Sequence, residues 1–471
     1  MIDIDRLEKY RENNRIEAKK AIGGLPHSLW ETYSAFANTL GGIILLGVEE
    51  LSDKSLHPIE LPYPDELVDE LWALINSEQK VSRNILTKDD VTIQESCGKK
   101  IVVINVPRAH RIDRPVFIDG DLYGGTYRRN GEGDYRCTRE ETDAMLRDAS
   151  ERAVDMQLLD LMDLSVFDDN SITGYRIRCE YEGSHDFSDL DDKAFLKEVG
   201  AAAEDEKGVL HPTAAGLLMF GYEYEIVRQF PLYHLEYREE NDNGTCFVIS
   251  SDSGDWSGNV YDFFQKVSSR LIEDMRFITD ETYEKSIRSA VREALSNCLI
   301  NADYYGSHGL QVTRRSSGII LSNPGGLRVE PDKAKIKGIS DPRNKGLINM
   351  FRFMGAGRGT GGGLRDIYSV WQDGGFDEPT LTEEFGEERT TLSLPVRSRT
   401  ERVRINDRQR EMIAEYLTDN VFADAESISK LMEGDMQRTD QLIRQLQWEK
   451  LIVAEEKDGK KVYRLPHEHR S

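Results

Sequence analysis

Two residues with complementary chemistry lie one helical turn apart in the second half of the chain. Glu293 and Asn297 belong to residues 285–306, whose apolar positions recur with the spacing of a helix. Residues four apart share one face of a helix. An amide oxygen can bind Mg²⁺, and a carboxylate one turn earlier can orient an attacking water. This pair therefore predicts metal-assisted chemistry on a phosphate.

A glycine-rich segment follows downstream. The residues from Gly359 to Gly363 read G-T-G-G-G and run into a predicted helix. Backbone N–H groups without side chains, at the N-terminus of a helix, can surround a phosphate. The alternative interpretation is that these glycines serve turns only.

The order of these motifs resembles the GHKL ATP-binding fold, in the divergent form that follows Schlafen domains in bacterial and archaeal proteins. The matching segments are E-A-L-S-N at 293–297, D-Y at 303–304, N-P-G-G-L at 323–327 and P-R-N at 342–344. The chain departs from that family at residues 301–302, where the family has His-Arg. It also departs at Asn323, since the wider group reads adenine with an Asp before the first glycine turn. The resemblance implies ATP, Mg²⁺ at Asn297, and Glu293 as the base of an ATPase. The other implied nucleotide-binding residues are Asn301, Asn323, Gly325, Gly326, Arg343, Gly359, Thr360, Gly361, Gly362 and Gly363.

The N-terminal region contains a second group of motifs. The segment from Ser34 to Glu50 predicts a helix end, a turn at Gly41 and a buried strand over residues 43–48. The A-F-A-N-T-L-G-G at 35–42 and the G-V-E-E at 47–50 resemble the N-terminal domain of the Schlafen family, also called the AlbA-like divergent domain. Residues 114–133 resemble the closing hairpin of that domain.

Three acidic residues carry an alternative function. In the nucleolytic branch of the Schlafen family, the positions of Glu12, Glu17 and Glu50 hold metal-binding carboxylates, and Lys19 would contact phosphate. Carboxylates around Mg²⁺ or Mn²⁺ can generate a hydroxide and stabilise a leaving oxygen. The resemblance thus also implies a metal-dependent nuclease acting on RNA or DNA, including a defence effector. Solvated surface acids are the competing interpretation.

The C-terminal tail predicts three helices and a hairpin that turns at residues 458–459. This pattern resembles a winged helix, which binds DNA or serves as a dimer or docking module. As a DNA reader, the third helix would present Gln437, Arg438, Gln441 and Arg444, with Lys460, Lys461 and Arg464 at phosphates.

Length and charge limit these interpretations. A chain of 471 residues predicts about three domains. The net charge of −24 opposes nucleic-acid binding except at local basic patches. The five scattered cysteines indicate a reduced, cytoplasmic protein, and no apolar run reaches the length of a membrane span.

We therefore expect an α+β multidomain protein. The main interpretation is that the protein is a homodimeric, ATP-binding transcriptional regulator that binds nucleic acid, with DNA favoured over RNA. An assembly scaffold with a vestigial nucleotide site is a third alternative. The predicted domains are a Schlafen/AlbA-like domain (1–150), a connecting α/β region (151–275), a GHKL-type domain (276–396), an Arg-rich linker (397–406) and a winged helix (407–471).

Overall fold

The computed structural model forms two compact units. The first comprises Met1–Val370 and Pro379–Leu394, and the second comprises Trp371–Glu378 and Pro395–Ser471. The structure describes residues 3–182, 186–241, 244–273, 281–329, 331–357, 362–374, 376–384, 388–396, 411–418, 420, 422–431, 439, 443, 452–457 and 460–465. These residues form a mixed α/β protein with several sheets, as the sequence predicts.

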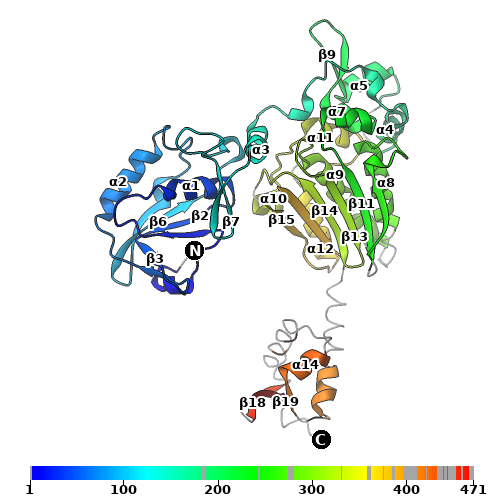
Figure 1. The fold of residues 1–471 in the computed structure, drawn as a ribbon. Coiled ribbons are helices and arrows are strands. Elements are labelled where there is room, and N and C mark those ends of the chain that lie inside the picture. Colours follow the sequence, from blue (N-terminus) through cyan, green and yellow to red (C-terminus); the bar gives the residue numbers. More distant parts are fainter. Residues whose placement is uncertain are drawn as a thin grey trace. The chain divides into compact units, whose positions relative to one another are not determined.

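The first unit begins with a four-stranded sheet of order β1-β2-β6-β5. Strand β1 is parallel to β2, and the other neighbours are antiparallel. Helices α1 and α2 pack beside these strands (Figure 1), and their buried side chains share one core with β2 and β6. The elements are β1 (Ile16–Lys19), α1 (Ser28–Asn38), β2 (Gly42–Leu46), β3 (Val48–Glu50), β4 (Leu56–Pro58), α2 (Pro64–Ile75), β5 (Val91–Ser96) and β6 (Lys99–Val106).

The glycine turn between α1 and β2 is confirmed, but the predicted strand over residues 43–48 is too long. Gly41 has φ +72°, and a Cβ there would come within 2.8 Å of the Val106 carbonyl oxygen. Strand β2 ends at Leu46 because Gly47 has φ +83°, which turns the chain into the short strand β3. The apolar run is therefore divided between two sheets.

A hairpin and a helix follow: β7 (Tyr127–Asn130), β8 (Gly133–Arg136) and α3 (Arg139–Ala149). Helix α3 begins with a capping box. The Thr138 hydroxyl accepts a hydrogen bond from the Glu141 N–H, and the Glu141 carboxylate accepts one from the Thr138 N–H. This capping box satisfies two N–H groups that the first turn leaves without a helical partner.

A six-stranded sheet of order β12-β11-β13-β14-β16-β15 forms the second part of this unit. Helices α8 and α9 lie on the same side of it (Figure 1). The boundary predicted between residues 275 and 276 therefore separates two stretches of chain that share one sheet. The elements are β11 (Leu235–Asn241), β12 (Gly244–Ser250), α8 (Val260–Glu273), α9 (Glu281–Asn301), β13 (Leu310–Arg315), β14 (Gly318–Pro324), β15 (Thr380–Glu384) and β16 (Arg389–Pro395).

Short helices surround this sheet and enclose an aromatic cluster. The Tyr175 ring lies edge-on to Phe220 and Tyr261, with ring centroids 5.0 Å and 5.7 Å away. The remaining elements are α4 (Asp169–Glu182), α5 (Asp192–Glu198), β9 (Ala202–Glu204), β10 (Leu210–Pro212), α6 (Ala214–Phe220), α7 (Glu223–Gln229), α10 (Pro331–Lys337), α11 (Lys345–Phe353) and α12 (Gly363–Asp373).

The second unit contains a three-stranded sheet of order β17-β19-β18 and its own core. Residues 411–418 are helical, and β17 (Ala423–Asp424), α14 (Ala425–Leu431), β18 (Val453–Lys457) and β19 (Lys460–Arg464) follow. The first two predicted helices and the hairpin are thus present. Most of the predicted third helix and the Arg-rich linker lie outside the described residues.

None of the helices in the described part of the chain is long and apolar enough to cross a membrane.

Candidate functional site

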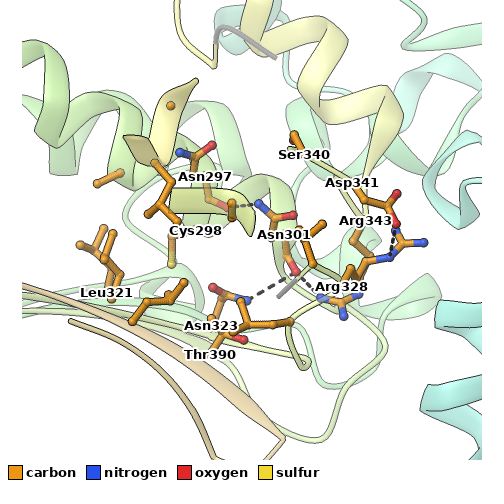
Figure 2. Close-up of a pocket in the computed structure, with 18 of the residues that line it drawn as sticks. Asn297, Cys298, Asn301, Leu321, Asn323, Arg328, Ser340, Asp341, Arg343 and Thr390 are labelled. Carbon is orange, nitrogen blue, oxygen red and sulfur yellow. Dashed lines mark hydrogen bonds and ion pairs between the residues drawn. The ribbon is translucent and has the colours of Figure 1, made fainter. Parts of the chain in front are cut away.

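A pocket in the first unit has α9 on one side and strands β14, β15 and β16 on another (Figure 2). Many of its lining residues are apolar, and a smaller set is polar, which is the usual composition of a ligand site. The apolar residues include Ala294, Cys298, Leu321, Leu327, Val329, Ile339, Ile348, Leu381 and Leu392. The polar residues include Glu293, Asn297, Asn301, Asn323, Arg328, Ser340, Asp341, Arg343 and Thr390.

Helix α9 buries its apolar face in the protein core, so its polar face is directed toward this pocket. Ile287, Val291 and Leu295 are almost fully buried, as the helical spacing predicts. Glu293, Asn297 and Asn301 follow each other at intervals of four residues, and all three line the pocket. The Asn301 amide nitrogen donates to the Asn297 carbonyl oxygen at 2.9 Å, which holds the Asn301 side chain against the helix (Figure 2).

The start of α12 lies against the same face of α9. A Cβ built on Gly363 would overlap the Glu293 carboxylate and come within 3.1 Å of the Asn297 amide nitrogen. Only glycine allows this approach, so the N-terminus of α12, with its partial positive charge, lies beside a carboxylate and an amide. Gly362 is also described, and its carbonyl oxygen accepts from the Asp366 N–H. Gly359, Thr360 and Gly361 lie outside the described residues.

The amide of Asn323 has a defined orientation at the opposite end of the pocket. Its nitrogen donates to the carbonyl oxygens of Pro324 at 3.1 Å and Asn301 at 3.4 Å. The reverse orientation would place its oxygen against two other oxygens, so Oδ1 lies on the side away from Asn301 (Figure 2). The buried Asn323 side chain therefore presents a hydrogen-bond acceptor to the pocket.

The two glycines after Asn323 allow side chains to close on the backbone. Gly325 has φ +94°, and a Cβ there would overlap the Arg343 guanidinium. A Cβ on Gly326 would overlap the Glu383 carboxylate. The turn is thus shaped by two charged side chains from other parts of the sequence.

Arg343 holds this end of the pocket together. Its guanidinium donates to the carbonyl oxygens of Asn301 and Gly326, and to both carboxylate oxygens of Asp148 at 2.8 Å. Burial alone would lower the pKa of Arg343, but the Asp148 carboxylate outweighs burial and raises it. Burial favours the neutral acid at Asp148, yet Arg343 lowers the Asp148 pKa, so this pair is charged.

The three acidic residues predicted for a metal site lie near one another, and each has a protein partner. Glu50 pairs with Lys54 at 3.4 Å through one carboxylate oxygen, and its other oxygen is buried without a hydrogen-bond partner. Glu17 forms ion pairs with Lys19 at 2.9 Å and with the buried Arg129 at 2.8 Å. A Glu12 carboxylate oxygen accepts from the Ala18 N–H at 3.0 Å. Burial raises the pKa of Glu12, and the charges of Glu17 and Glu50 raise it further. Within the described residues, no group of three or more His, Cys, Asp or Glu side chains could hold a metal ion.

The cationic residues predicted to contact nucleic acid have different surroundings. Lys19 is 9% exposed and holds Glu17, which limits its access to a phosphate. Lys461 is exposed on β19, with its ammonium 5.8 Å from the Tyr463 ring centroid. Lys460 belongs to β19, but its side chain lies outside the described residues, as do Arg438, Gln441 and Arg444.

Sequence reasoning missed three charged residues of the pocket region. Arg328 directly follows the N-P-G-G-L motif and Asp341 directly precedes P-R-N, so their positions beside known motifs were an available signal. Asp148 had no such signal, because it meets Arg343 across 195 positions of sequence.

Comparisons with known proteins identify part of the chain. Residues 12–138 match a family model described as Schlafen, AlbA_2, so this region is a Schlafen/AlbA_2 domain. Residues 143–236 match a domain of unknown function, DUF8451. No curated protein matches the chain.

The solved structures that are similar to the chain include two with TM-scores below 0.5. The DIP2311 protein of Corynebacterium diphtheriae is 18% identical, with a TM-score of 0.42, and the match covers 96% of this chain and 80% of that protein. The other is the N-terminal domain of a Nitrosomonas europaea protein described as related to the ATP-dependent DNA helicase RecG. It is 32% identical, with a TM-score of 0.23, and the match covers 29% of this chain and 92% of that domain.

Proposed function

We propose that this protein, whose residues 12–138 form a Schlafen/AlbA_2 domain, binds ATP with Mg²⁺ and changes its interaction with nucleic acid according to nucleotide state. One observation carries the proposal: Glu293, Asn297 and the glycine start of α12 meet in a single pocket. The proposed site is of the divergent GHKL type.

The two ends of the pocket suit the two ends of a nucleotide. The apolar residues beside Asn323 would enclose the base, and the Asn323 oxygen would accept a hydrogen bond from the amino group of adenine. The N-terminus of α12 would face the phosphates, because its N–H groups and the helix dipole favour negative charge.

The residues beside Gly363 also fit a magnesium ion. Mg²⁺ takes oxygen ligands, few of them from the protein, and shares the phosphates of its nucleotide. The Asn297 amide oxygen would supply a protein ligand, and the metal would neutralise phosphate charge. Glu293 would orient a water near the terminal phosphate, which is the arrangement for slow hydrolysis.

The other domains support a regulatory role. The Schlafen/AlbA_2 domain is compatible with nucleic-acid association, and a tail with a helix, a three-stranded sheet and its own core is compatible with a winged helix. Nucleotide would act as a switch only if it binds two arrangements of the chain with different affinity. We extend the proposal to a cytoplasmic, homodimeric transcriptional regulator. Sedimentation with and without ATP tests the dimer.

Isothermal titration calorimetry with ATP and Mg²⁺ tests the site. The unaltered chain should bind. Asn297→Ala should lose at least tenfold in affinity, as should Gly363→Val, whose folding is checked by thermal denaturation. The matched control is Asn349→Ala, because Asn349 is exposed on α11 and does not line the pocket. Absence of heat with the unaltered chain, or equal affinities for Asn297→Ala and Asn349→Ala, would refute the proposal.

A further inference from the structure

The segment from Pro107 to Arg114, which we call the arginine loop, directly follows strand β6 of the Schlafen/AlbA_2 domain. It carries Arg108, Arg111 and Arg114 at intervals of three residues. Two of these arginines contact residues that also line the proposed nucleotide pocket, so the arginine loop supports a wall of that pocket.

Arg108 supports one side of the turn formed by Gly325 and Gly326. Its guanidinium donates to both carboxylate oxygens of Glu383, at 2.5 Å and 2.8 Å, and to the Leu327 carbonyl oxygen at 3.2 Å. The same Glu383 carboxylate accepts from the Leu327 N–H at 2.9 Å. Arg108 and Glu383 are 13% and 7% exposed. The backbone carbonyl and N–H groups of Leu327, a residue that lines the pocket, are therefore both bound by the ion pair between Arg108 and Glu383. Arg108 belongs to the Schlafen/AlbA_2 domain.

Arg111 holds the facing side. It forms an ion pair with Asp341 and donates to the Asp148 carbonyl oxygen at 2.8 Å. Asp148 in turn binds Arg343 through its carboxylate, and Arg328 donates to the Asp148 carbonyl oxygen at 3.2 Å. Asp341, Arg343 and Arg328 all line the pocket, so this wall is fixed by a charged network.

We infer that the arginine loop couples the nucleotide pocket to the Schlafen/AlbA_2 domain, with Arg108 and Arg111 as positioning residues. The inference rests on the proposed nucleotide site and adds the route of its regulation. Because the pocket wall depends on contacts with the arginine loop, the pocket binds nucleotide well only when the arginine loop is docked against that wall. By linkage, bound nucleotide must then stabilise the docked arrangement by the same factor.

A charge swap in the full-length chain tests this inference by ATP titration. Arg108→Glu places two carboxylates together, and Glu383→Arg places two guanidiniums together, so each should weaken ATP binding at least tenfold. The double variant Arg108→Glu/Glu383→Arg restores an ion pair and should recover most of that loss, which independent effects at the two positions would not predict. The matched control is Arg6→Ala, which removes an exposed arginine of the N-terminal region whose ion pair, with Asp3 at 3.9 Å, does not involve the arginine loop.

Hydrogen exchange of the unaltered chain supplies the reciprocal measurement. ATP should slow exchange of the amides of residues 109–114, and this protection should disappear in Arg108→Glu. If the chain binds ATP but the swap variants bind as tightly as Arg6→Ala, the coupling is refuted and the nucleotide site stands. If the double variant fails to recover affinity, or the arginine loop gains no protection, the coupling is also refuted. If the unaltered chain does not bind ATP, the proposed function fails and the inference fails with it.

Discussion

Arg129 offers the sharpest test of how the first domain is held together. Its side chain is 1% exposed and pairs with Glu17 and Asp134, each at 2.8 Å, while also donating to the Asn13 carbonyl oxygen at 2.8 Å. The two carboxylates are 13% and 12% exposed. Arg129→Met would leave Asp134 without its cation and Glu17 with Lys19 alone, both in a poorly solvated place. Removing one partner of a buried ion pair costs about 3–5 kcal/mol, so we expect a loss of that size.

The measurement must report on this domain alone, because a chain with several domains does not unfold in one two-state transition. Hydrogen exchange in rising urea, read on peptides from residues 12–138, gives the local free energy of opening. The matched control is Arg83→Met, since Arg83 is 63% exposed and its ion pair should contribute about 0–1 kcal/mol. A loss below about 1 kcal/mol in Arg129→Met, or one equal to that of Arg83→Met, would refute the reasoning.

Three further predictions concern pH, catalysis and nucleic acid. Burial, with the charges of Glu141 and Asp303, raises the pKa of Glu388 to about 7. The folded state then retains a proton that the unfolded state loses, so the local free energy of opening should fall by up to about 3 kcal/mol as pH rises from about 4.5 to 7. Glu388→Gln should reduce this slope, read by hydrogen exchange in rising urea on peptides that contain residues 388–396, and an unchanged slope would contradict the assignment. If the chain hydrolyses ATP, Glu293→Gln should slow phosphate release at least tenfold while changing ATP affinity by less than about threefold, and an unchanged rate would exclude Glu293 as the water-orienting group. Lys461→Ala should weaken DNA binding and reduce the slope of log affinity against log salt by about 0.9 in fluorescence anisotropy, and equal slopes would exclude a phosphate contact.

Local patterns predicted the elements that local physics determines. The turn at Gly41 depends on one residue that tolerates positive φ, and the structure has Gly41 at φ +72°. The spacing of apolar residues along α9 predicted its buried face and hence the direction of Glu293 and Asn297. In contrast, the length of β2 was overestimated, because the apolar pattern continues through a glycine with positive φ. The pattern of apolar residues alone does not indicate where the backbone conformation ends a strand.

The charged framework around the pocket could not be predicted in the same way. Arg343 meets Asp148 across 195 positions, and Arg108 meets Glu383 across 275. No periodicity or motif links residues at such separations, because the chain between them must fold before they meet. The motifs therefore indicated residues that line the pocket, while the residues that support those positions became visible only in three dimensions.

The same network changes how the charge of this chain should be interpreted. A net charge of −24 already opposes phosphate binding, and several cations of the first domain are engaged internally. Lys19 and Arg129 neutralise Glu17, while Arg108 and Arg111 neutralise Glu383 and Asp341. Counting basic residues in the sequence thus overestimates the cations that a nucleic acid can reach. The arginine loop can contact phosphates only after it leaves its two carboxylate partners, and the coupling inferred above predicts that bound ATP opposes that release. Bound nucleotide would then disfavour contact between these arginines and a nucleic acid, although the two ligands share no pocket.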